Sequence, residues 1–134
     1  MKVNKNIFRG YDIRGLVGSD LSDEVAEHIG KAYGTYLVKR GIREAIIGRD
    51  LRETSPAYSK AVAKGLTWCG IDVVDIGMCL VGTFYWAGHH LKRRGGIYVS
   101  ASHNPREYNG FKLLADYSET LVSDGIQEMR TLIE

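Results

Sequence analysis

Residues 95–105 read GGIYVSASHNP, in which a short apolar run passes directly into a polar turn. The run 97–100 is apolar, partly β-branched and aromatic, which is typical of a buried strand. Pro105 fixes its own backbone and disfavours a helical conformation at Asn104, so the turn that follows this strand is stiff. We therefore expect Ser102 to be held on a rigid turn at the end of a strand.

On both sides of this stretch, short apolar runs alternate with helical patterns. Strands are expected at 44–48, 71–76, 97–100 and 111–114. Helices are expected after Ser22, from Ser55-Pro56, over 83–93 and over 123–133. This alternation predicts the α/β class, with a mainly parallel or mixed sheet of about four strands flanked by helices.

Local signals mark the ends of the first helix. Ser22 can cap it, and Asp23 and Glu24 suit the positive end of the helix dipole. Gly41 follows its last turn as a stop signal. Together with Asp20, these two carboxylates are interpreted as residues of the helix start rather than as ligands of a metal ion.

The composition indicates one globular domain. The chain has 134 residues, of which 44% are hydrophobic and 25% are charged, enough for one core and too few for two ordinary domains. Its net charge of +2 gives no bulk attraction to nucleic acid, and no apolar run has the length of a membrane span or signal peptide. We expect a cytoplasmic protein without nucleic-acid or membrane partners. Cys69 and Cys79 are interpreted as core residues rather than as a disulfide pair.

Ser102 is the first candidate functional residue. A serine on a rigid turn at a strand end is positioned for chemistry or for binding an anion, and Lys112 follows closely enough to fold back over the same site. Asn104 and Asn109-Gly110 add turn residues that tolerate left-handed conformations. Arg49-Asp50 ends another expected strand, and ligands of such sheets gather beyond the carboxyl ends of their strands. These two residues are expected to shape the site rather than react.

The segment FRGYDIRG, residues 8–15, is the second candidate. It is polar and contains glycine, so it is not typical of a core. Arg9 and Arg14 flank Tyr11 and Asp12, and arginine suits phosphate because its planar fork donates two hydrogen bonds at once. On these residues alone, a phosphate-handling site and a plain structural loop are equally supported. A serine hydrolase of the α/β type is disfavoured because the sequence lacks G-x-S-x-G.

Taken together, the motifs resemble the first domain of the phosphohexomutases, in particular phosphomannomutase/phosphoglucomutase. They are FRGYDIRG at 8–15, GRD at 48–50, ASHNP at 101–105 and NGFK at 109–112. Their order and spacing match the family over nearly the whole chain. The resemblance implies that residues 1–134 form α/β/α domain I, a single domain of a larger enzyme whose later domains are absent from this chain.

The resemblance further implies that Ser102 carries a phosphoryl group. It would donate this group to a hexose 1- or 6-phosphate, and the resulting 1,6-bisphosphate would reorient and return its other phosphoryl group. The implied catalytic residues are Ser102, His103 and Lys112, with Lys112 a candidate for proton transfer. The implied residues that bind substrate or phosphate are Tyr11, Arg14 and Asn104. Hexose phosphate is the implied substrate, and the remaining domains of the same polypeptide are the implied partners.

Mg²⁺ is the implied cofactor, and hexose 1,6-bisphosphate is the implied activator. From this chain, only Ser102 is expected to contact the metal, through its phosphoryl group, because the family's closely spaced aspartates belong to a second domain. The isolated chain is therefore expected to be inactive. Two alternatives stay open: a non-catalytic phospho-sugar-binding module, and a phosphoglucosamine mutase domain, since some of those enzymes also have serine at the position of Ser100.

Overall fold

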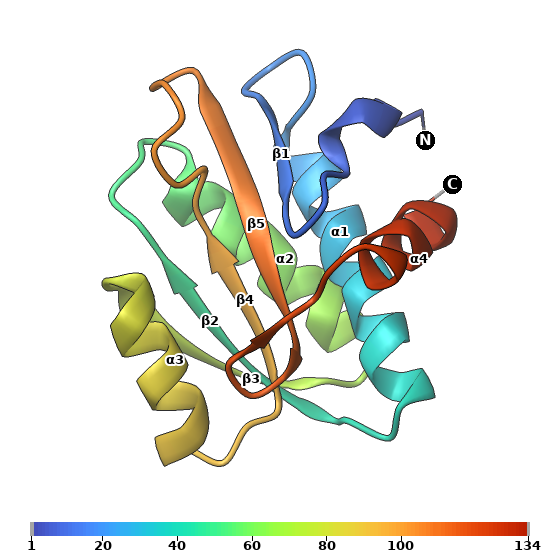
Figure 1. Ribbon diagram of the computed structural model, residues 1–134, viewed down its shortest axis with the longest axis vertical. Helices are drawn as coiled ribbons and strands as arrows, with labels where there is room; N and C mark the ends of the chain where they lie inside the picture. Colours follow the sequence, from blue (N-terminus) through green and yellow to red (C-terminus); the bar gives the residue numbers. More distant parts are fainter. Residues whose placement is uncertain (1, 134) are drawn as a thin grey trace.

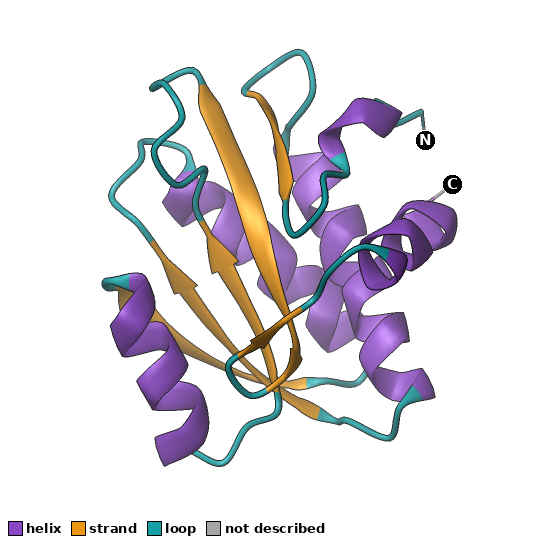
Figure 2. Ribbon diagram, in the orientation of Figure 1, coloured by secondary structure: helices purple, strands orange, loops and turns teal. Residues whose placement is uncertain are grey.

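The computed structural model describes residues 2–133, which form a mixed sheet with helices on both faces (Figure 1). The strands are β1 (Ile13–Leu16), β2 (Glu44–Arg49), β3 (Asp72–Met78), β4 (Gly95–Val99), β5 (Tyr108–Asp116) and β6 (Glu119–Thr120). The helices are the 3₁₀-helix η1 (Lys5–Ile7), α1 (Asp23–Lys39), α2 (Ser55–Trp68), α3 (Val81–His90) and α4 (Asp124–Ile133). Figure 2 shows the strands as one sheet with helices on both sides, which confirms the predicted α/β class.

The sheet has six strands in the order β1-β5-β4-β2-β3, with β6 paired to β5. Strand β2 runs parallel to both β3 and β4, whereas β5 is antiparallel to β4 and to β1. The sheet is therefore mixed, which the sequence allowed, with a parallel half formed by β3, β2 and β4 and an antiparallel half. Its six strands exceed the four that were expected. Because β2 and β4 point the same way, the loops that follow them meet at one edge (Figure 1).

Strand β1 was not expected from the sequence. Its residues IRGL interrupt the apolar pattern with an arginine and a glycine, yet Ile13 is fully buried and pairs with Phe111 of β5. Asp12, immediately before it, is only 1% exposed. The interpretation of 8–15 as a segment outside the core is therefore wrong, because pairing with β5 buries part of it.

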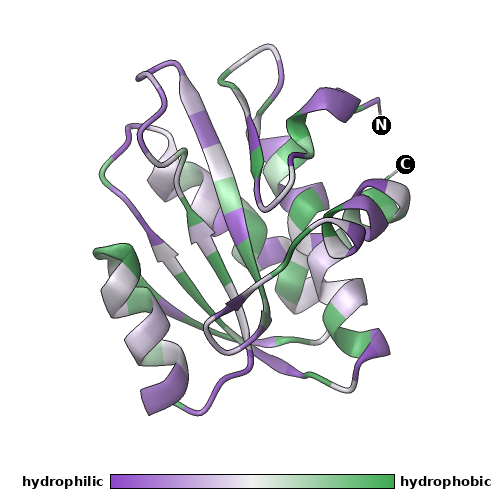
Figure 3. Cartoon of the chain, viewed as in Figure 1, coloured by the Kyte–Doolittle hydropathy of each residue, from purple (hydrophilic) through white to green (hydrophobic). Residues whose placement is uncertain are grey.

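Helices α1 and α2 cover one face of the sheet, and glycines let them pack closely. A Cβ atom on Gly30 would meet the carbonyl oxygen of Val62, and one on Gly65 would meet that of Glu27. Most of the core lies on this face. On the other face, Phe84 of α3 is fully buried in a smaller apolar cluster against β2 and β4. Figure 3 shows hydrophobic residues along these central strands.

The predicted start and stop signals of α1 are present. Ser22 Oγ accepts a hydrogen bond from the main-chain N–H of Val25 at 3.1 Å, and Gly41 has a φ of 73°. Asp20 differs from its interpretation, because it accepts hydrogen bonds from the N–H of Leu16 (3.0 Å) and from Asn4 Nδ2 (2.7 Å). These bonds lower the pKa of the Asp20 carboxyl, which closes the turn after β1 instead of lying in α1.

Helix α3 ends at His90 rather than near Arg93, and Lys92 has a φ of 55° that is incompatible with a continuing helix. Cys69 and Cys79 are free thiols and partly buried. Within residues 2–133, none of the helices has the length and apolar character needed to span a membrane.

Candidate functional site

Ser102 lies just beyond the end of β4, in the loop that leads to β5. It is exposed, and its φ of 57° is in the left-handed region. For a residue other than glycine, such a conformation costs roughly 1–3 kcal/mol and persists where neighbouring groups impose it. The N–H of Ser102 donates to Ser100 Oγ at 2.9 Å. These contacts hold the serine in one orientation at the edge of the sheet.

His103 contacts the Ser102 hydroxyl. Its Nδ1 lies 3.2 Å from Ser102 Oγ, within hydrogen-bond distance. Side chains of adjacent residues seldom meet in this way, and here the turn at Ser102 brings them together. The pair can exchange a proton directly.

Asn104 builds the turn around the serine. Its main-chain N–H and its Nδ2 both donate to the carbonyl oxygen of Ala101, at 3.1 and 2.7 Å. After Pro105, the N–H of Tyr108 donates to the proline carbonyl at 3.0 Å. Asn104 is therefore a residue of the loop itself, with its side-chain donor used within the loop.

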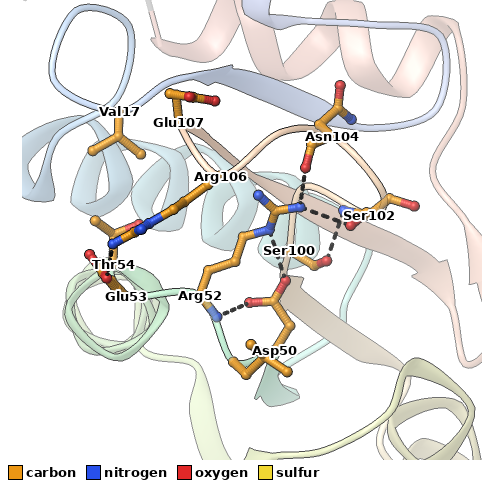
Figure 4. Close-up of a pocket in the computed structure, with 11 residues that line it drawn as sticks. Val17, Asp50, Arg52, Glu53, Thr54, Ser100, Ser102, Asn104, Arg106 and Glu107 are labelled. Atoms are coloured by element: carbon orange, nitrogen blue, oxygen red, sulfur yellow. Dashed lines mark hydrogen bonds and ion pairs between the residues drawn. The ribbon is translucent and has the colours of Figure 1, made fainter.

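Arg52, in the β2–α2 loop, is a residue of the site that was not predicted from the sequence. Its Nη1 donates to the carbonyl oxygens of Pro105 (2.8 Å) and Tyr108 (3.0 Å). Its Nη2 donates to those of Ser102 (2.9 Å) and Asn104 (2.6 Å). Figure 4 shows the guanidinium directed at the loop that carries Ser102. The only sequence signal was the position of Arg52 just after Arg49-Asp50, at the end of a strand parallel to β4.

Asp50 organises the β2–α2 loop. One carboxylate oxygen accepts from Ser55 Oγ (2.6 Å) and from the N–H of Arg52 (3.1 Å), while the other lies 3.3 Å from Arg52 Nε. Asn109, which is fully buried, donates to Thr54 Oγ1 (2.8 Å) and Ser55 Oγ (3.1 Å). The network ties this loop to the start of β5.

Arg49, in contrast, lies 3.9 Å from Asp75 in a different ion pair.

Lys112 shares a cavity with Ser102. The cavity has a volume of about 220 Å³, and Leu80 and Val81 at the start of α3 also line it. The first turn of α3 has no side-chain cap, so its main-chain N–H groups and the helix dipole favour a negative charge there. Lysine, helix start and serine therefore surround a space that suits an anion.

Arg14 lies on β1, opposite Gly110 of β5. A Cβ atom on Gly110 would lie 3.0 Å from Arg14 Cγ and 3.1 Å from the carbonyl oxygen of Ser100, so glycine leaves room for the arginine. Arg14 Nε donates to Asp12 Oδ1 at 3.1 Å. Burial raises the pKa of the Asp12 carboxyl, and the positive charges of Arg14 and Lys112 oppose this shift.

The structure does not bring Tyr11 to Ser102. Tyr11 is 53% exposed, and neither it nor Arg14 lines the cavity shared with Lys112 or a larger cavity of about 1060 Å³. That larger cavity lies between the β2–α2 loop and residues 100–107 (Figure 4). Ser102 lines both cavities and is therefore accessible from two directions.

The described part of the chain does not form a metal-binding cage. Among residues 2–133 there is no group of three or more His, Cys, Asp or Glu side chains placed to hold an ion. The carboxylate of Asp50, which lines the larger cavity with Ser102, is already used by Arg52 and Ser55. These residues therefore do not fit a complete Mg²⁺ site.

Comparison with known proteins gives one consistent result. Residues 5–134 match the family model described as phosphoglucomutase/phosphomannomutase, alpha/beta/alpha domain I. The chain is 44% identical over 132 residues to a phosphomannomutase of Salmonella montevideo, covering 98% of this chain and 28% of the relative. It is 42% identical over 129 residues to a phosphomannomutase/phosphoglucomutase of Pseudomonas aeruginosa, covering 96% of this chain and 28% of the relative.

A solved structure gives the same fold. It is a phosphoglucomutase/phosphomannomutase family protein from Burkholderia thailandensis, with a TM-score of 0.91 and 33% sequence identity. The match covers 98% of this chain and 30% of that chain. The chain thus spans about 28% of the length of the curated relatives named above.

Proposed function

Because the chain belongs to the phosphoglucomutase/phosphomannomutase family, as its alpha/beta/alpha domain I, we propose that it supplies the phosphoserine of an enzyme that interconverts hexose 1-phosphate and hexose 6-phosphate. The observation that carries the proposal is the placement of Ser102. Ser102 is exposed beyond β4, its Oγ lies 3.2 Å from His103 Nδ1, and it shares a cavity with Lys112. A module that only binds sugar phosphate has no need of this arrangement.

In the first half-reaction, a hydroxyl of hexose phosphate attacks the phosphorus of phosphorylated Ser102. The bond from Ser102 Oγ to phosphorus breaks as the bond from the sugar oxygen forms, giving a hexose 1,6-bisphosphate. Lys112 accepts the sugar hydroxyl proton, and His103 Nδ1, at 3.2 Å, donates the proton that Ser102 Oγ requires. The bisphosphate then reorients, and the reverse steps return its other phosphoryl group to Ser102.

Charge balance supports the same residues. A phosphoserine carries about −1.5 to −2 charges at neutral pH, and catalysis of phosphoryl transfer depends mainly on positioning and on offsetting that charge. The first turn of α3 contributes positive charge from the small cavity, and Lys112 adds its own charge once it has accepted the sugar proton. We assign Arg14, held by Asp12, and Tyr11 to the binding of phosphate or substrate from the β1 side. Asn104 maintains the turn.

Mg²⁺ is the proposed cofactor, and a hexose 1,6-bisphosphate is the proposed activator. When bound, Mg²⁺ offsets negative charge on the phosphoryl oxygens. From this chain it would contact only the phosphoryl group on Ser102, and we assign its other ligands to parts of the protein outside these residues. The proton transfers by Lys112 and His103 do not depend on Mg²⁺. The proposed compartment is the cytoplasm, and the proposed partners are the hexose phosphate and the remaining domains of the polypeptide.

The test is turnover by the full-length protein that contains this domain. With Mg²⁺ and a trace of bisphosphate, we expect conversion of mannose 1-phosphate or glucose 1-phosphate to the 6-phosphate, and loss of this activity in Ser102→Ala. Ser118→Ala, an exposed serine beyond the other end of β5, is the matched control and should retain activity. A wild-type protein that binds hexose phosphate without converting either sugar would contradict the proposal and favour a binding module.

A further inference from the structure

We propose that Arg52 is a positioning residue for phosphoryl transfer: its guanidinium fixes the loop 101–108 so that Ser102 keeps its left-handed backbone and presents its hydroxyl to the substrate. The role of Ser102 itself rests on the function proposed above. Arg52 contacts neither the Ser102 hydroxyl nor the small cavity shared with Lys112. Its effect on the reaction therefore passes through the main chain.

Each of the three guanidinium nitrogens of Arg52 has a partner within the protein. Four main-chain carbonyl oxygens of the loop accept from Nη1 and Nη2 at 2.6–3.0 Å, and Nε lies 3.3 Å from Asp50 Oδ2. The side chain is only 15% exposed. An arginine that binds substrate phosphate would keep donors free, whereas the donors of Arg52 are directed at the protein. We call these four contacts between the Arg52 guanidinium and the loop carbonyls the clamp.

Arginine is the only side chain suited to this geometry. Its five N–H donors are fixed in one plane, so two nitrogens can each reach two carbonyls. The acceptors belong to Ser102, Asn104, Pro105 and Tyr108, which lie on both sides of the turn. Lysine has the same charge but carries its three donors on one atom, so it cannot span these four positions.

The clamp acts directly on Ser102. The carbonyl of Ser102 accepts from Arg52 Nη2 at 2.9 Å, while its N–H donates to Ser100 Oγ at 2.9 Å. Both polar main-chain groups of the residue are thus held by side chains from outside the turn. A φ of 57° is unfavourable for serine and persists only when the surroundings impose it. Arg52 is one of the groups that do so.

The experiment compares Arg52→Lys with Arg93→Lys in the full-length protein. Arg93 is 16% exposed and donates to the main-chain carbonyl and the carboxylate of Asp72 at the start of β3, so the control makes the same chemical change at a similarly buried arginine that lines neither cavity. In Arg52→Lys we expect kcat to fall at least about 30-fold with KM within about threefold, because positioning is lost and ground-state binding is not. Arg93→Lys should match wild type in both.

Hydrogen exchange of the loop supplies a measurement that does not depend on turnover. The amides of Asn104 and Tyr108, which close the turn beside the clamp, should exchange at least about tenfold faster in Arg52→Lys than in wild type. If wild type shows no mutase turnover, the proposed function fails and this measurement alone decides the role of Arg52. Unchanged exchange with unchanged kcat would overturn the proposal.

Two other results would also overturn it. A rise in KM at constant kcat would mean that Arg52 binds substrate. If Arg52→Lys does not fold, Arg52→Gln is measured in the same way, since glutamine retains two N–H donors. Failure of both variants to fold would assign Arg52 to the stability of the domain rather than to the placement of Ser102.

Discussion

Lys112 and Ser102 line the same cavity of about 220 Å³, although they belong to different segments of the sheet edge. Lys112 is on β5, paired with Tyr98 of β4, whereas Ser102 follows the end of β4. The antiparallel turn between these two strands folds the lysine back over the serine. This relationship makes a kinetic prediction.

Lys112→Met in the full-length protein should lower kcat by about 10²–10⁴, the usual contribution of a positioned acid or base. KM for hexose phosphate should change less, since a proton acceptor acts in the transition state. Steady-state assays with glucose 1-phosphate or mannose 1-phosphate measure both. Lys64→Met, whose side chain is 74% exposed on α2, is the matched control. A change in KM alone would show that Lys112 binds substrate and does not transfer the proton.

Gly110→Ala should destabilise the domain. The new methyl group would meet the carbonyl oxygen of Ile13, so β1 must move away from β5. Overpacking of this kind costs typically about 1–3 kcal/mol in the free energy of unfolding. Urea denaturation measures it, with Gly82→Ala as control because a Cβ there has nothing within 4 Å. Equal stability of the two variants would show that β1 can shift freely.

The stability of the domain should depend on Tyr98 at high pH. Burial raises the pKa of Tyr98 to about 12, and its hydroxyl donates to the carbonyl of Cys79 at 2.6 Å. A pKa raised in the folded state gives stability that is complete below the unfolded value, near 10, and is lost as pH rises toward about 12.

The free energy of unfolding of wild type should therefore exceed that of Tyr98→Phe by about 1 kcal/mol at neutral pH, the usual net contribution of a hydrogen bond. This difference should shrink above pH 10. Urea unfolding across that pH range measures the difference, in which contributions common to both proteins cancel. Tyr11→Phe, with a phenol that is 53% exposed in wild type, is the control. A margin that stays constant to pH 12 would contradict the assignment.

The isolated chain of residues 1–134 should fold but not catalyse. Both faces of its sheet have an apolar core of their own. Orientation of substrate can supply roughly 7–11 kcal/mol of barrier reduction, and the described residues form no metal cage. We expect cooperative urea unfolding together with no measurable turnover. Turnover within about tenfold of the full-length protein, a barrier difference of only ~1.4 kcal/mol, would show that the rest of the polypeptide is dispensable.

The sequence predicts those features that depend on local chemistry. Ser22 and Gly41 act at the ends of α1 as their residue types suggest, and Pro105 marks a stiff turn after β4. The apolar runs place β2 and β4 because burial on both faces leaves a nearly continuous apolar pattern. The edge strand β3 has no fully buried residue, and its β-branched run at 73–76 places it instead.

Features that depend on distant partners could not be predicted. Strand β1 forms because Ile13 meets Phe111 on β5, which the polar pattern of 8–15 conceals. In the sequence, nothing distinguishes Arg52 from other charged loop residues. It lies at the serine loop because β2 and β4 pair in parallel and end at the same edge of the sheet. The contact between Ser102 and His103 likewise requires the positive φ of the serine, which no residue type at that position signals.

The central claim is that Ser102 carries the transferred phosphoryl group, and mass spectrometry of the full-length protein tests it most directly. After incubation with a hexose 1,6-bisphosphate and proteolysis, we predict phosphate on Ser102 in the loop peptide. The same peptide should lose its phosphate when the protein is mixed with excess hexose 1-phosphate. Phosphate found on Ser100 instead, or a Ser102 that stays unmodified while the protein turns over substrate, would contradict the account.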